Sequence, residues 1–144
     1  MQASRDIGAL IGRILLAVIF VLSGLNKVMN PRMTMGYMAH AGVAGVLVGP
    51  GLTLSVLVEL GCGLLLMIGY QARWAALIIF LWFIPVTIMF HVIPHYQAIA
   101  AHQAMVAMQQ QINYMKNLSI MGGLLLLASH GPGAISLDGR GTSA

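Results

Sequence analysis

Charged residues are scarce in this sequence. Only 7% of its 144 residues are charged, as seven lysines and arginines and three acids, whereas soluble domains carry roughly 25%. Hydrophobic residues make up 59% of the chain, and its mean hydropathy is +0.89. This balance excludes an ordinary soluble enzyme and predicts an integral membrane protein in contact with the lipid bilayer.

Cysteine and clustered basic side chains are also nearly absent. The one cysteine, Cys62, cannot form an internal disulfide, a CxxC pair or a thiolate metal cage. The sequence has no CxxCH haem-attachment motif and no glycine-rich phosphate loop. The basic residues are too few and too scattered to follow a phosphate backbone. We therefore expect no intrinsic cofactor and no nucleic-acid partner.

Long apolar runs are what the sequence does contain. Since roughly 20 apolar residues cross the hydrocarbon core of a bilayer, the runs predict membrane-spanning helices. The predicted spans cover about residues 7–25, 51–69, 74–93 and 117–130. We expect an all-α fold with a single domain over residues 1–144, an integral membrane four-helix bundle with interfacial helical segments in the loops.

Two loop segments are predicted to lie as helices at the membrane surface. One covers residues 33–44, and the other is the segment 94–116, which is rich in Gln, His, Met and Ala. The fourth apolar run has only about 14 residues. It must therefore extend back into the polar segment or lie in locally thinned lipid.

An even number of spans places both termini on one side of the membrane. If that side is the cytoplasm, three basic residues face inward and three face outward, and Arg13 gives the inner side its majority. The inner set is Arg5, Arg73 and Arg140, and the outer set is Lys27, Arg32 and Lys116. We expect a multi-pass protein of the plasma (inner) membrane with cytoplasmic termini.

Glu59 lies near the middle of the second predicted span and is the only acid between Asp6 and Asp138. An ionisable group inside a span is costly and usually finds a partner in the bundle interior. Arg13 in the first span differs from Glu59 in height by roughly 9 Å, most of which an arginine side chain can reach across. The sequence leaves open whether Arg13 or the lysines at the span ends hold Glu59.

Antiparallel spans gather further polar residues at one end of the bundle. Lys27 ends the first span where the second begins, and His91 ends the third where the fourth begins. The candidate ligand-binding residues are Glu59, His91, Lys27, Lys116, Asn117 and Arg13. Such a group suits a small polar headgroup, a quinone carbonyl or a proton path. The alternatives are an ion pair that fixes helix packing and lysines that extend to the lipid headgroups. No catalytic residue is assigned.

Methionine and histidine cluster in two of the loops. Thioether and imidazole ligands suit Cu(I), but methionine is also an ordinary packing residue, so no metal site is favoured. The weak metal candidates are Met33, Met35, Met38, His40, His102 and Met105.

Several short motifs are spread along the chain. They include Gly12-Arg13, Ser23-Gly24 followed by Lys27, Glu59-Leu60-Gly61, His91 after Phe90, and Lys116-Asn117 before Gly122-Gly123. Together they resemble the DoxX family of small membrane proteins. The resemblance implies a compact four-helix membrane protein, and it places the family's polar positions at the six candidate residues named above.

The resemblance also implies a class of function. The family is named for a small subunit-like relative in thiosulfate:quinone oxidoreduction, and other members are linked to oxidative-stress complexes. We therefore expect a quinone-linked or redox-associated subunit, non-autonomous within a membrane oxidoreductase, with other membrane or redox subunits or a second copy as partners. The alternatives are a structural or assembly subunit, a Met/His copper-binding protein and, more weakly, a small-molecule transporter.

Overall fold

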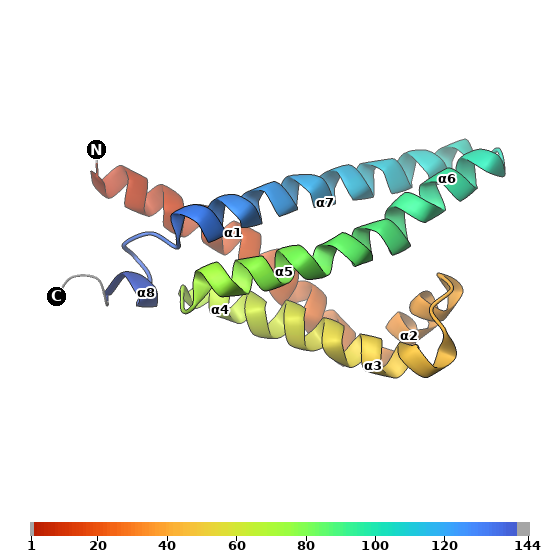
Figure 1. The fold of residues 1–144 in the computed structure, drawn as a ribbon, viewed down its shortest axis with the longest axis horizontal. Helices are drawn as coiled ribbons and strands as arrows, with labels where there is room; N and C mark the ends of the chain where they lie inside the picture. The colour runs from red at the N-terminus through yellow and green to blue at the C-terminus, as the bar shows by residue number, and fades with distance from the viewer. Residues whose placement is uncertain (1, 141–144) are drawn as a thin grey trace.

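Four helical rods form the protein in a computed structural model that describes residues 2–140, with side chains for residues 6–139 (Figure 1). The rods are α1 (Gln2–Met29); α3 (Gly45–Val56), the π-helical η1 (Leu57–Cys62) and α4 (Gly63–Ile68); α5 (Ala72–Thr87), the π-helical η2 (Ile88–Val92) and α6 (Ile93–Ala100); and α7 (Ala104–His130). Helix α2 (Pro31–His40) lies in the first loop, and α8 (Leu137–Arg140) follows the fourth rod. The described residues contain no strand, so the all-α prediction is confirmed.

Three helical stretches are long and apolar enough to cross a membrane. They are Asp6–Met29, Gly45–Ile68 and Ala72–Ala100. Large apolar side chains on these rods, such as Leu15, Leu22 and Leu57, are more than half exposed. In a bilayer these side chains contact lipid, while the helices satisfy their own backbone groups.

The core takes one large, fully buried side chain from each rod. These side chains are Phe20, Leu66, Ile79 and Leu124. Phe20 of α1 packs edge-on against Phe83 of α5, with ring centroids 5.1 Å apart, an arrangement that aromatic pairs prefer. The rods are therefore held together through a continuous interior from α1 to α7.

The segment 94–116 does not form one surface helix, and that prediction is wrong. Helix α6 continues the third rod to Ala100, a turn with His102 at φ 56° reverses the chain, and α7 begins at Ala104. Nδ1 of His95 lies 2.8 Å from the carbonyl oxygen of Ala107 across this hairpin. Polar groups of this segment therefore form contacts between α6 and α7. The fourth helix extends back into the polar segment, the first of the two alternatives for that short span.

The two ends of the bundle differ in structure. The first turns of α1 lie at the same end as α8, whereas α2 and the tip of the α6–α7 hairpin lie at the other (Figure 1). The charge count that favoured cytoplasmic termini uses Arg5 and Arg140, whose side chains lie outside the described residues.

The glycines of α1 stand in two different surroundings. A Cβ atom at Gly24 would lie 2.7 Å from the Cβ atom and 2.8 Å from the backbone nitrogen of Leu60 in η1. At Gly8 and Gly12 nothing described lies within 4 Å of such an atom. Only Gly24 is therefore needed for close packing of α1 on the second rod.

We predict that Gly24→Ala lowers the thermal unfolding midpoint in detergent, because the backbone of η1 must move to admit the methyl group. Overpacking of this kind costs about 1–3 kcal/mol. Gly12→Ala is the matched control, and its midpoint should be unchanged or slightly higher because alanine is the better helix former. Equal midpoints for the two variants would contradict the close contact between α1 and η1.

Candidate functional site

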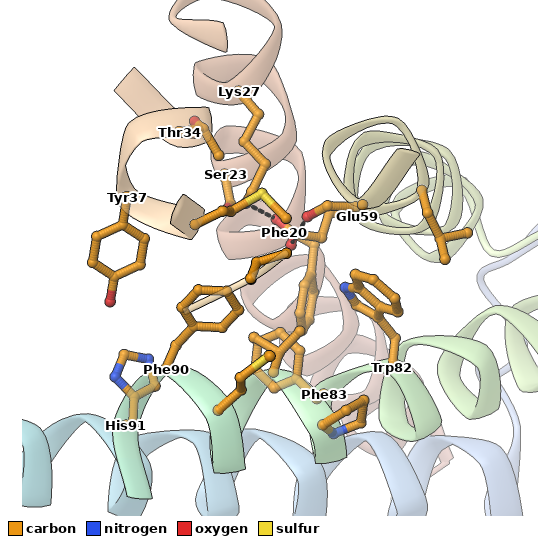
Figure 2. Close-up of a pocket in the computed structure, with 18 of the residues that line it drawn as sticks. Phe20, Ser23, Lys27, Thr34, Tyr37, Glu59, Trp82, Phe83, Phe90 and His91 are labelled. Atoms are coloured by element: carbon orange, nitrogen blue, oxygen red, sulfur yellow. Dashed lines mark hydrogen bonds and ion pairs between the residues drawn. The ribbon is translucent and has the colours of Figure 1, made fainter. Parts of the chain in front are cut away.

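A cavity of about 950 Å³ lies beneath α2, between the rods. Its walls are mostly apolar and aromatic, with Phe20, Trp82, Phe83 and Phe90 among the lining residues (Figure 2). Cavities of several hundred cubic ångströms with apolar walls and a few polar groups are typical of small-molecule sites. We call this space the cavity.

An ion pair between Lys27 and Glu59 lies in the wall of the cavity (Figure 2). Nζ of Lys27 donates to Oε2 of Glu59 at 2.5 Å and to the hydroxyl of Ser23 at 2.7 Å. The hydroxyl of Ser55 donates to Oε1 of Glu59 at 2.8 Å. The Glu59 side chain is only 5% exposed and that of Lys27 18%. Both carboxylate oxygens are thus paired, and the pair adds no net charge to the cavity.

The lysine retains capacity to donate. An ammonium group has three N–H donors, and in the described part of the chain two of them reach Ser23 and Glu59. The third can donate to an acceptor oxygen on a molecule in the cavity. The serines reach their partners because each lies four residues before a charged residue, which places both on one helix face.

Two ionisable residues of the cavity lie in π-helical turns, one on the second rod and one on the third. Glu59 lies in η1 and His91 in η2. Such turns are rare in helices and frequently occur at functional sites. Two of them therefore border this cavity from neighbouring rods.

The remaining polar residues of the cavity have different surroundings. Nδ1 of His91 lies 2.8 Å from Oε1 of Gln110, which anchors the imidazole to α7. The buried Asn117 donates to the hydroxyl of Thr87 at 3.1 Å and so joins α7 to α5. Lys116 is exposed and lies 3.5 Å from the Asn113 side-chain oxygen. The side chain of Asn117 is therefore used in a contact between helices, whereas the ammonium group of Lys116 is exposed.

Arg13 lies at the other end of α1 and does not line the cavity. Its buried guanidinium donates to the carbonyl oxygen of Pro132 at 2.6 Å and to that of Ile135 at 2.9 Å. In the same C-terminal segment the carboxylate of Asp138 accepts the backbone N–H groups of Gln71 and Ala72, each at 2.9 Å. Of the two alternatives for Glu59, the structure therefore forms the pair with Lys27. The arginine is used to hold the segment that follows α7.

Helix α2 covers the cavity through Tyr37, whose ring stacks on Phe90 with centroids 5.4 Å apart. Partial removal from water raises the pKa of the Tyr37 phenol above its ordinary value. Met33 and Met38 of the same helix also line the cavity.

The other weak metal candidates do not lie in the cavity wall. Met35 and His40 are exposed on α2, and His102 and Met105 are exposed at the α6–α7 hairpin. The described residues contain no group of three or more His, Cys, Asp or Glu side chains placed to hold a metal ion.

Sequence reasoning missed Ser55, Trp82 and Tyr37. The spacing of four residues between Ser55 and Glu59 could have identified the serine. Nothing in the sequence separates an aromatic residue that faces the cavity, such as Trp82, from one that faces outward, such as the exposed Trp74.

Comparison with known proteins finds relatives that the chain matches over nearly their whole length. The family model described as DoxX matches residues 8–92. The chain is 35% identical over 138 residues to inner membrane protein YqjF of Escherichia coli (strain K12), a match that covers 96% of this chain and 95% of that protein. It is 33% identical to inner membrane protein YphA of the same organism, over 96% and 93% of the two chains. No solved structure matches the chain.

We predict that double-mutant cycles separate the two possible partners of Glu59. Lys27→Met should cost about 3 kcal/mol of unfolding free energy because it leaves a buried carboxylate unpaired. Adding Glu59→Leu should recover most of this loss, which gives a coupling of at least about 1 kcal/mol. Denaturant titration in mixed micelles measures these free energies.

The same cycle with Arg13→Met is the control. Arg13 and Glu59 share no contact, so their effects should add to within about 0.5 kcal/mol. Additive effects for Lys27 together with coupling for Arg13 would overturn the assignment of the ion pair.

Proposed function

Because the chain belongs to the DoxX family of integral membrane proteins, we propose that it is a quinone-binding, redox-associated membrane subunit. The observation that carries the proposal is the cavity, which combines aromatic walls with one buried, internally neutral ion pair. A quinone has the matching chemistry, with a flat apolar ring, carbonyl oxygens and an apolar tail.

The charge of the cavity supports a neutral ligand. Glu59 is already neutralised by Lys27, and Lys116, the other charged lining residue, is exposed to the outside. A charged group placed beside the ion pair would therefore have no counterion in an apolar space, at high cost. A neutral ring can instead pack against Phe20 and Phe83 and accept a hydrogen bond from the third N–H of Lys27. Its tail would lie between the rods, in contact with lipid.

Electron transfer to or from a quinone needs a second redox centre. The sequence has one cysteine and no haem-attachment motif, so we place that centre on a partner subunit. Two relatives are named inner membrane proteins, and we assign this chain to the same membrane. With cytoplasmic termini, the cavity would lie in the outer half of the bilayer, since it is at the end of α1 opposite to the terminus.

We predict that the protein purified in native-lipid nanodiscs retains a quinone that mass spectrometry of an organic extract detects. Glu59→Gln should retain about tenfold less, equivalent to about 1.4 kcal/mol, because Lys27 loses its counterion and the cavity acquires a charge. Asp6→Asn removes one negative charge outside the cavity and is the matched control, with quinone content like the wild type.

A second variant guards against a folding defect in Glu59→Gln. His91→Ala leaves the ion pair intact and opens the cavity beside Phe90, and it should also lose quinone. Equal quinone in every variant would contradict the proposal. Wild-type protein without quinone would favour the assembly alternative, in which the open Gly8 and Gly12 face of α1 contacts a partner.

A further inference from the structure

Trp82 carries a hydrogen-bond donor for which the described residues supply no acceptor. Among the described residues its Nε1 atom is buried and has no hydrogen-bond partner. The residue lines the cavity, and Figure 2 shows the indole nitrogen on the ring edge that faces Phe20 and Glu59. A buried indole N–H normally finds an acceptor, and an unmet buried donor costs stability. The atom therefore calls for an explanation.

The carboxylate of Glu59 lines the same cavity but does not accept the Trp82 N–H. Oε1 of Glu59 accepts from Ser55 and Oε2 accepts from Lys27. The only other buried atom of this kind in the described chain, Nε of Arg13, belongs to a guanidinium whose other two nitrogens are bonded at the far end of α1. Trp82 differs because its side chain lines the cavity, so a ligand bound there can displace the groups that cover Nε1 and accept its N–H.

We propose that Trp82 Nε1–H binds an acceptor oxygen of the neutral ligand in the cavity. An indole can donate but not accept, so this position selects a carbonyl-type oxygen over a hydrocarbon edge. The inference rests on the proposed quinone function and assigns one ring carbonyl to Trp82. Trp82 is a binding and specificity residue, distinct from the ion pair that sets the charge of the cavity.

A matched pair of probes tests the hydrogen bond. One is decyl-trimethyl-1,4-benzoquinone, whose fully substituted ring cannot add the thiol of Cys62. The other is decylpentamethylbenzene, in which methyl groups replace the two carbonyl oxygens. Trp82→Phe keeps an aromatic wall and removes the donor. Trp74→Phe makes the same change at an exposed position, 64% exposed, and is the control.

In nanodiscs, Trp82→Phe should weaken binding of the quinone probe by about three- to tenfold and that of the hydrocarbon by less than twofold. Trp74→Phe should change neither affinity. If Trp82→Phe weakened the binding of both probes equally, the inference would be overturned, because Trp82 would then contribute only packing contacts. Wild-type protein that does not prefer the quinone probe over the hydrocarbon would instead refute the proposed function.

A spectroscopic measurement avoids any change at Trp82. The chain has two tryptophans, so Trp74→Phe leaves Trp82 as the single reporter. The ultraviolet resonance Raman band that reports hydrogen bonding of the indole N–H should shift when the quinone probe binds and stay fixed with the hydrocarbon. An unshifted band under saturating quinone would refute the hydrogen bond while leaving quinone binding intact.

Discussion

The carboxylate of Glu59 needs a partner, and this need shapes the end of the molecule that holds the cavity. A buried charge in an apolar bundle is tolerated only when it is paired and hydrogen-bonded. The pair with Lys27 joins the second rod to α1. Beside it, a Cβ atom at Gly24 would lie 2.8 Å from the backbone nitrogen of Leu60, so the same two helices are closely packed there. Ion pair and helix contact are therefore parts of one interface.

The two cations in the stretch Asp6–Met29, Arg13 and Lys27, serve different ends of the bundle. Arg13 binds two backbone carbonyls of the C-terminal segment, a task for which the forked guanidinium has several donors. Lys27 meets a carboxylate and a hydroxyl with a compact ammonium group that has a donor to spare. The end near the termini is closed by backbone contacts, while the opposite end keeps a cavity whose polar groups can meet a ligand.

Much of the architecture follows from composition. Scarce charge and long apolar runs predict an all-α membrane fold. The antiparallel order of the spans then places five polar residues at one end of the bundle, and all of them line the cavity: Lys27, Glu59, His91, Lys116 and Asn117. Depth along a span could not choose between Arg13 and Lys27, because a flexible side chain covers the difference in height. The composition of the segment 94–116 fits a surface helix and a helical hairpin equally well, and only the contacts across the hairpin decide between them. The direction of Trp82 depends on the rotation of α5, which a run of apolar residues does not encode.

Photoaffinity labelling with an azido-substituted quinone, followed by peptide mapping, tests the central claim that a neutral ring binds in the cavity beside the ion pair. We predict adducts on α2 and on residues 82–91, protected by an excess of unlabelled quinone. Adducts confined to outward-facing positions such as Leu15 and Leu57, with no protection by competitor, would contradict a site inside the bundle.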